Sequence, residues 1–160
     1  LMFSATITGT IITRYENAFA AVPLLVSFIP MLMDTGGNCG SQSSTLIIRG
    51  LALDEIKFKD IFRVIFKEFR IALLVGIGLA IANGIRIFIM YKDLKMAIVI
   101  ALSLSLIVII AKIIGCTLPL FAKKLHMDPA IMASPLITTV VDTCSIMIYF
   151  SIATRVFTLS

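Results

Sequence analysis

The sequence predicts an all-α, polytopic membrane protein with five transmembrane helices, of which the second and the fifth are kinked. Hydrophobic residues make up 59% of the 160 residues and charged residues only 14%. A soluble domain of this size cannot bury so much apolar surface. At roughly 20 to 30 residues per span with short loops, this length fits about five helices. The apolar runs are long and continuous rather than alternating, which argues against a β-barrel.

A single membrane domain over residues 1–160 is expected to hold these helices in succession. The predicted spans are 1–19, 21–48, 64–90, 96–121 and 129–157. The fifth span has the clearest start, because Asp128 can cap free N–H groups and Pro129 suits the first helical position, which needs no N–H. Pro135 then interrupts the hydrogen-bond ladder inside the span, so we expect a kink there.

Basic side chains are concentrated in two connections between the predicted spans. They are Arg49, Lys57, Lys59 and Arg63 in the 49–63 connection, and Lys123 and Lys124 in the 122–128 connection. Basic loops favour the cytoplasmic side, so both connections are expected there, with the N-terminus cytoplasmic and the C-terminus outside the cell membrane. We interpret the net charge of +5 as setting the orientation of the protein in the lipid membrane, and no nucleic-acid partner is expected.

The cysteines do not indicate a metal centre. Cys39, Cys116 and Cys144 stand apart among apolar or small residues, and His126 is the only histidine. Buried thiols that pack as small apolar side chains are the ordinary interpretation. With no paired cysteines and no histidine–cysteine cluster, a structural zinc site is not expected.

A polar stretch, DTGGNCGSQSS, interrupts the second predicted span. At 100° per residue, one helical face about 100° wide collects most of its polar and small side chains. That face carries Asp34, Gly37, Asn38, Ser41 and Thr45. Packing of helices through small residues would explain the glycines, but not the clustering of Asp34 and Asn38 with Gln42. The pattern therefore favours a polar pathway for a cation.

The fifth predicted span repeats this pattern. Ser134, Thr138, Asp142 and Ser145 fall within about 80° of arc around the helix. Asp142 lies roughly 20 Å from the helix start, close to the middle of the membrane, where an acid costs on the order of 3 kcal/mol. Such acids usually face a polar interior and mark an ion route. The alternative is a protonated or paired structural carboxylate.

The chemistry of these two faces suits a hard cation. They carry hydroxyls, an amide, bare carbonyls and one or two carboxylates. Such oxygen groups are ligands for Mg²⁺ or Ca²⁺ rather than for thiol-loving metals. Asp142, Thr138 and Ser134 are the predicted metal residues, and a lone carboxylate in a hydroxyl-lined route fits hydrated Mg²⁺. Spacing alone does not choose among Mg²⁺, Mn²⁺ and Ca²⁺. One copy of the polar face cannot surround an ion, so a two-fold homodimer is predicted.

Lys112, in the fourth span, is a further charge within the membrane. Its ammonium and the Asp34 carboxylate are expected at similar depth, and a charge pair there costs much less than either charge alone. We therefore hypothesise that Lys112 neutralises Asp34 and leaves Asp142 as the principal cation site. The rival hypothesis makes Asp34 a second carboxylate facing the ion, with Lys112 bound elsewhere.

Two segments resemble the MgtE family of Mg²⁺ channels and transporters. They are Pro30 to Ala52, with its DTGGN and IIRGLA elements, and Leu118 to Ala153, with its DPA, TTVVD and IYF elements. The resemblance implies a five-helix homodimer with a pore on the dimer axis between the second and fifth helices. It also implies that Asp142 is the central Mg²⁺-binding acid. The pore-lining neighbours it implies are Gly37, Ser41, Thr45, Ile131, Ser134 and Thr138.

The sequence departs from the family pattern at a few of these positions. Ser41 and Ser134 stand where well-known members carry asparagine, and Asp34 and Lys112 are unusual for their places. The family's cytoplasmic domains, which sense Mg²⁺ and gate the pore, are not in this sequence.

The function expected from these features is transport of hydrated Mg²⁺ rather than catalysis. A coupled exchanger for divalent cations is the alternative, followed by a membrane scaffold that does not transport. An intramembrane aspartyl hydrolase is disfavoured because its companion GxGD motif is missing.

Overall fold

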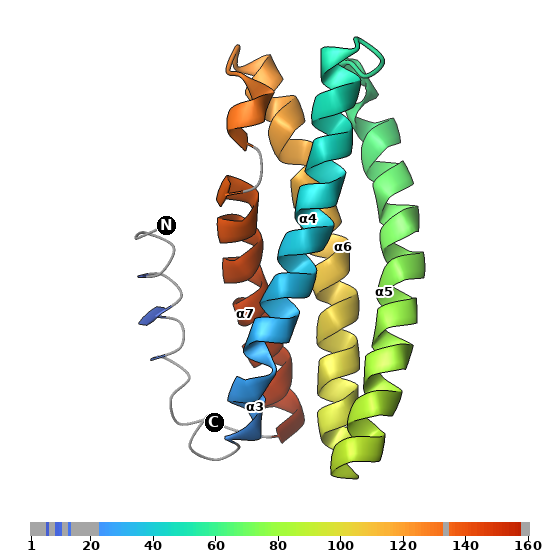
Figure 1. Ribbon diagram of the computed structural model, residues 1–160, viewed down its shortest axis with the longest axis vertical. Coiled ribbons are helices and arrows are strands. Elements are labelled where there is room, and N and C mark those ends of the chain that lie inside the picture. The colour runs from blue at the N-terminus through green and yellow to red at the C-terminus, as the bar shows by residue number, and fades with distance from the viewer. Residues whose placement is uncertain (1–5, 7–8, 11–12, 14–22, 133–134, 158–160) are drawn as a thin grey trace.

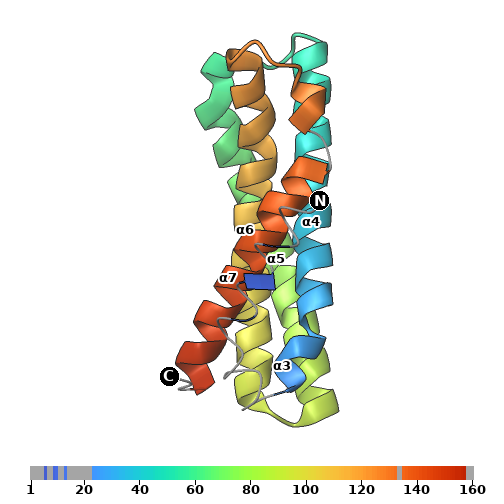
Figure 2. The same ribbon diagram turned by 90° about the vertical axis from the view of Figure 1, so that its left-hand side faces the viewer.

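The computed structural model describes residues 6, 9–10, 13, 23–132 and 135–157, and over these residues the chain is helical with no strand. Four long helices run side by side along the long axis (Figures 1 and 2). In the described part of the chain they are α4 (Ile29–Ala52), α5 (Ile61–Tyr91), α6 (Leu94–Lys124) and α7 (Pro135–Phe157). The shorter elements are α3 (Leu24–Ser27) and the 3-10 turns η1 (Phe58–Asp60) and η2 (Pro129–Met132). The all-helical class is thus confirmed for these residues, whereas most of the predicted first span lies outside them.

Three helices of the described chain are long and apolar enough to cross a membrane. They are Phe58–Tyr91, Leu94–Lys124 and Pro135–Phe157, and an 18-residue window within each has a mean hydropathy of 2.1, 2.8 and 1.7, respectively. The helix α4 has 24 residues, enough for about 36 Å, but is not one of these three because its polar stretch lowers its hydropathy. A helix of that length with a polar face suits a position in which the polar face is kept from lipid.

The structure describes a helical break near a proline in the second span but not in the fifth. The second span is divided at Phe28, so that the short α3 precedes α4 and Pro30 stands in the first turn of α4. In the fifth span, α7 is described from Pro135 and the turn η2 ends at Met132, with residues 133–134 outside the described residues, so the kink at Pro135 stays a prediction. A proline without N–H is best tolerated in the first turn of a helix, which suits Pro30 in α4. The expected cap is present on η2, where Ala130 N donates to Asp128 Oδ1 at 2.9 Å.

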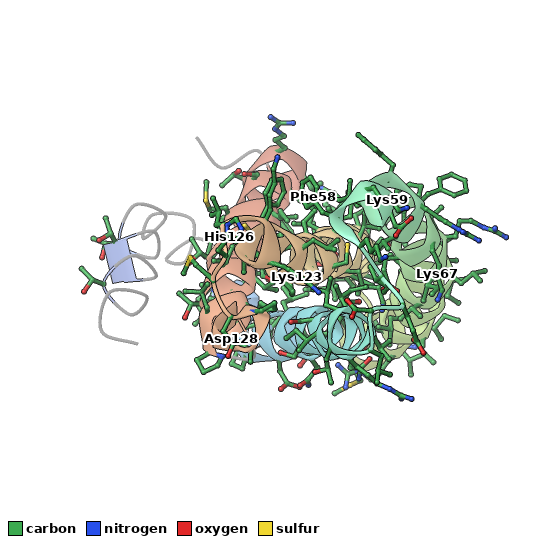
Figure 3. All side chains as sticks on the ribbon, turned by 90° about the horizontal axis from the view of Figure 1, so that it is seen from above. Phe58, Lys59, Lys67, Lys123, His126 and Asp128 are labelled. Atoms are coloured by element: carbon green, nitrogen blue, oxygen red, sulfur yellow. The ribbon has the colours of Figure 1, made fainter. Side chains whose placement is uncertain are left out.

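The connections η1 and η2 lie at the same end of the bundle (Figure 1). Figure 3 looks onto this end, where several lysines gather. Lys123 Nζ donates to Leu51 O at 2.9 Å, and Lys124 Nζ lies 4.5 Å from the centre of the Phe58 ring. These contacts tie the end of α6 to the end of α4 and to η1.

The central helix is α6, which contacts α4, α5 and α7. Glycine lets α4 approach it closely, because a Cβ at Gly115 of α6 would collide with the carbonyl oxygen of Gly40 and lie 3.0 Å from its Cα. Close backbone approach through small residues is a main source of helix association in membranes. At the other end of the bundle, Tyr149 OH of α7 donates to Leu25 O of α3 at 2.9 Å. These contacts fix α4 between α6 and α7.

The crossing at Gly115 predicts a specific sensitivity to one methyl group. Gly115→Ala should lower the stability of the protein in detergent by about 1–3 kcal/mol, because the backbones of α4 and α6 must separate. Gly78→Ala is the matched control, since a Cβ at Gly78 of α5 would meet nothing within 4 Å. Thermal unfolding of both variants checks this, and equal unfolding temperatures would contradict the crossing.

Candidate functional site

The predicted cation residues meet where α7 approaches α4. A Cβ at Gly37 of α4 would lie 3.3 Å from Thr138 Cγ2 and 3.7 Å from Asp142 Oδ1, both on α7. The absence of a side chain at Gly37 therefore allows the Asp142 carboxylate to lie directly against α4. Asp142 is half-buried, whereas Asp34, one turn before Gly37, is exposed.

A hollow of about 180 Å³ opens at this contact. It is lined by Met33, Asp34, Gly37 and Asn38 of α4 and by Thr138 and Asp142 of α7. Because a single water needs only roughly 10–15 Å³ of such space, the hollow can hold several water molecules. Two carboxylates, an amide and a hydroxyl thus surround a space in which a cation can keep most of its water.

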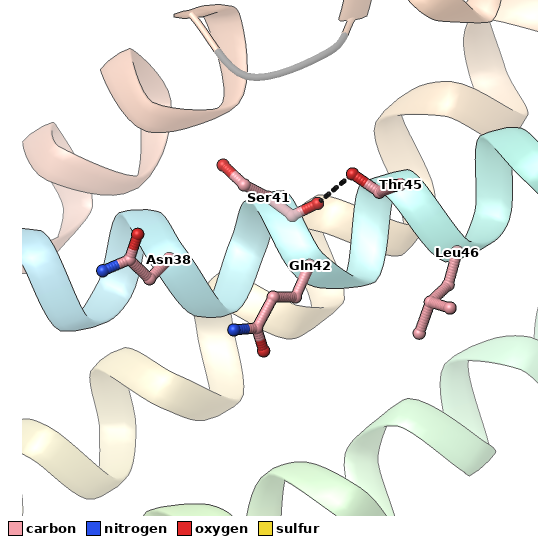
Figure 4. A pocket seen from close by; sticks show the side chains of 5 residues that line it. All are labelled: Asn38, Ser41, Gln42, Thr45 and Leu46. Atoms are coloured by element: carbon pink, nitrogen blue, oxygen red, sulfur yellow. Dashed lines mark hydrogen bonds between the residues drawn. The ribbon is translucent and has the colours of Figure 1, made fainter.

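A second hollow continues along the same face of α4 (Figure 4). It measures about 470 Å³ and is lined by Asn38, Ser41, Gln42, Thr45 and Leu46. The two hollows share Asn38, so the polar face is continuous from Asp34 to Thr45, over about 16 Å of helix. Thr45 Oγ1 donates to Ser41 O at 2.9 Å, which leaves the hydroxyl oxygen free to accept from a water of hydration.

The structure therefore brings together most of the predicted site and separates one residue from it. Ser145 is buried, donates to Val141 O at 2.7 Å, and lies where a Cβ at Gly36 would come within 2.9 Å of its Oγ. It belongs to the packed contact between α7 and α4 rather than to the open face. Ser134 lies outside the described residues, and Ile131 is described only as part of η2.

Gln42 lines the second hollow although it falls outside the predicted face of α4. It lies about 80° around the helix from Asp34, just beyond the 100° arc. Its long amide side chain is exposed and extends the polar lining. Gln42 belongs to the polar cluster recognised in the sequence, but the chosen arc of the helix left it out of the predicted lining.

The acids of one chain do not form a closed metal cage. No group of three or more His, Cys, Asp or Glu side chains in the described residues could hold a metal ion. A dehydrated divalent ion needs six or more oxygen ligands, whereas a hydrated Mg²⁺ needs only one or two carboxylates. The hollow with Asp34 and Asp142 fits the hydrated ion.

A separate charge cluster is buried on the opposite side of α4. Lys112 Nζ of α6 lies 3.3 Å from Glu68 Oε2 of α5 and donates to Ser43 Oγ of α4 at 3.1 Å. Ser43 Oγ in turn donates to Glu68 Oε2 at 2.7 Å. All three residues are buried, with exposed fractions of 6% for Lys112, 3% for Glu68 and 0% for Ser43. The cluster joins three helices at one point.

The predicted pair of Asp34 with Lys112 is therefore wrong, because Lys112 has Glu68 as its partner. Ser43 lies about 180° around α4 from Asp34, so the buried lysine and the exposed aspartate are on opposite faces of that helix. Asp34 is left facing the hollow that it shares with Asp142. The rival hypothesis expected Lys112 to be bound elsewhere, as it is here, and its claim that Asp34 faces an ion stays a prediction.

Sequence reasoning missed Glu68 because it stands among basic residues near the start of a span. A usable signal was present in the sequence, since Glu68 falls at the same four-residue spacing as the apolar or small Val64, Ala72 and Gly76, all of which are buried. That spacing places Glu68 on the helical face that packs against α6.

Comparisons with known proteins give one consistent result. A family model described as "MgtE: Divalent cation transporter" matches residues 29–152, from the start of α4 into α7. The chain is 40% identical over 154 residues to the magnesium transporter MgtE of Bacillus subtilis. It is 36% and 31% identical over 153 residues to the magnesium transporters MgtE of Thermus thermophilus and Enterococcus faecalis. Each alignment covers 96% of this chain but 34% of the relative, so the chain spans about a third of these relatives.

The buried cluster predicts which carboxylate loses its partner when Lys112 is replaced. Lys112→Met should destabilise the protein by about 3–5 kcal/mol, because it leaves the Glu68 carboxylate buried without a cation. Adding Glu68→Gln should recover most of that loss in a thermal or denaturant unfolding measurement. Adding Asp34→Asn instead is the control and should recover nothing. Recovery with Asp34→Asn but not with Glu68→Gln would refute the assignment.

Proposed function

Since the chain belongs to the MgtE family of divalent cation transporters, we propose that it conducts hydrated Mg²⁺ through a pore on the axis of a homodimer. The family supports magnesium transport across a membrane in general, and the relatives are magnesium transporters by name. The pore, its ion and the assembly are the proposal.

The observation that carries the proposal is the hollow shared by Asp34 and Asp142. Asp142 attracts the ion and holds it through water, because a half-buried carboxylate in a membrane helix has little bulk water to screen it. Thr138 and Asn38 line the same hollow and can hydrogen-bond the waters of the ion. Full dehydration, which Mg²⁺ resists, is thereby avoided.

The homodimer follows from the exposed face of α4. Asp34, Asn38, Gln42 and Thr45 are all exposed in one chain. Facing lipid, such a run of polar groups would cost several kcal/mol per unsatisfied group. Two copies related by a two-fold axis would place these faces opposite one another around a water-filled path. The predicted first span, over 1–19, completes the five helices that we propose for each copy.

The proposed location is the cell membrane. The end of the bundle with η1 and η2 carries the lysines of Figure 3, and basic ends face the cytoplasm. The N-terminus is then cytoplasmic and the C-terminus outside.

A coupled divalent-cation exchanger is the second candidate, and one observation favours it. Asp34 adds a second carboxylate to the hollow, and a coupled carrier needs a group for a second ion or proton. Mg²⁺ uptake into liposomes separates the two mechanisms. A channel responds to an applied potential alone, whereas an exchanger also requires a gradient of the second ion.

Asp142→Asn should lower Mg²⁺ uptake into liposomes by about tenfold or more, since even outer-shell changes at metal sites cost 10–100-fold in affinity. The fold should persist because the amide has the shape of the carboxylate. Asp54→Asn is the matched control, because Asp54 lies in an exposed turn with φ of 56°, a conformation that asparagine tolerates. Undiminished uptake by Asp142→Asn would overturn the assignment.

Thiol cross-linking tests the assembly. In a background with the three native cysteines replaced by alanine, Thr45→Cys should cross-link two copies with a short bifunctional maleimide in membranes. Ile81→Cys, on the exposed side of α5, is the control and should remain monomeric on a denaturing gel. Cross-linking at Ile81 but not at Thr45 would place the contact between copies elsewhere.

A further inference from the structure

The first third of α5 carries three basic side chains that the proposed ion path does not use. Arg63, Lys67 and Arg70 recur at intervals of four and three residues, which places them within about 60° on one face of the helix. All three side chains are exposed. Glu68 points the other way, into the buried cluster with Lys112. This stretch of α5 therefore has a charged outer face and a packed inner face.

A hollow of about 450 Å³ accompanies these charges. It is lined by Arg63, Phe66, Lys67, Arg70, Ile71 and Leu74. Phe66 is 64% exposed and Leu74 is 77% exposed, so the floor of the hollow and its continuation along the helix are apolar. The site thus combines a cationic rim with an uncovered apolar track.

No acidic side chain forms an ion pair with any of the three basic residues in the described chain. Other lysines near this end have partners, since Lys112 pairs with Glu68 and Lys123 lies 3.7 Å from Asp54. None of the three charges on the α5 face is held in an ion pair within the described chain, although Lys67 also lines a hollow with Glu55 and Glu68. Positive charge of this density favours an anionic partner.

The position of the face along α5 identifies the kind of partner. The stretch 71–91 is about 32 Å long at 1.5 Å per residue, which matches the roughly 30 Å hydrocarbon core of a bilayer. With the core taken over this part of the apolar helix Phe58–Tyr91, the three basic side chains lie just beyond it, at the level of the lipid headgroups. Ile71 and Leu74 lie where the acyl chains begin.

We propose that this face of α5 binds an anionic phospholipid of the cytoplasmic leaflet. The face consists of the basic rim of Arg63, Lys67 and Arg70 and of the apolar Leu74 next to it. The phosphate lies between the basic side chains and the acyl chains run along the apolar part of α5. Arginine offers planar, bidentate hydrogen bonds to phosphate oxygens, and lysine adds a point charge. A role in topology alone would not require the three charges to share one face with an apolar hollow. The proposal does not depend on which ion the protein transports.

The inner face of the same helical turns connects the proposed lipid site to α4, the helix that lines the ion path. Glu68 follows Lys67 directly and accepts the hydrogen bond from Ser43 of α4. A lipid that restrains this part of α5 would therefore also restrain the contact that supports α4.

Native mass spectrometry of the protein with phosphatidylglycerol and with phosphatidylcholine tests the proposal. The wild type should retain phosphatidylglycerol, which carries net negative charge, more tightly than phosphatidylcholine. The triple variant Arg63→Gln, Lys67→Gln, Arg70→Gln should weaken retention of phosphatidylglycerol by roughly a hundredfold. Each basic residue near an anionic lipid surface contributes about 1 kcal/mol of attraction, and the variant removes all three. If the triple variant folds poorly, the double variant Arg63→Gln, Arg70→Gln, which keeps Lys67, replaces it. This variant should weaken retention of phosphatidylglycerol by roughly thirtyfold.

The control removes the same number of charges from the same end of the protein. Arg49→Gln, Lys57→Gln, Lys59→Gln should retain phosphatidylglycerol as the wild type does, because these residues lie off the α5 face. Equal loss in the control would show a general effect of charge and overturn the site. Protection of the wild type against thermal unfolding by inorganic phosphate alone, as strong as by phosphatidylglycerol, would show a phosphate site and overturn the lipid assignment.

Discussion

The close approach of α4 to its neighbours through glycine is the constraint on which the rest of the structure depends. Gly40 meets Gly115 of α6, and Gly37 lies against Thr138 and Asp142 of α7. These contacts leave no space for side chains at the two crossings, so the backbone of α4 lies close to both neighbours while buried side chains such as Leu32 and Ile47 pack beside them. A helix held by large apolar side chains could not present a polar face to a hollow and still pack at this distance.

The two polar faces of α4 have opposite requirements, and the structure meets them differently. On the buried side, Ser43 joins Glu68 and Lys112, so that each charge has a partner away from lipid. On the open side, Asp34 shares a hollow with Asp142, and no basic side chain of the described residues lines it. Paired charge joins the helices on one side, and on the other side we propose that the two acids attract an ion. This division explains why a chain with few charged residues places several of them at membrane depth.

Much of this arrangement could be predicted from the sequence, because helical periodicity at 100° per residue identifies which side chains share a face. The grouping of Asp34, Gly37, Asn38, Ser41 and Thr45 needed only that rule, and the structure has them along two adjoining hollows. Contacts between helices do not follow from periodicity, and there the predictions were wrong. Depth alone suggested Asp34 as the partner of Lys112, but the rotation of α4 about its axis brings Ser43 and Glu68 to the lysine instead. The same lack of rotational information placed Ser145 on the open face although it packs against Gly36.

The central claim is that a divalent ion is held, with its water, in the hollow of Asp34 and Asp142. Anomalous X-ray diffraction from crystals grown with Mn²⁺ tests it most directly, because Mn²⁺ prefers the same oxygen ligands as Mg²⁺ and its position can be seen element-specifically. We expect a peak beside Asp142 near Gly37 and Thr138, too far from the carboxylate oxygens for full dehydration, and its loss in Asp142→Asn. A Mn²⁺ peak elsewhere in the protein, with none in this hollow, would contradict the account.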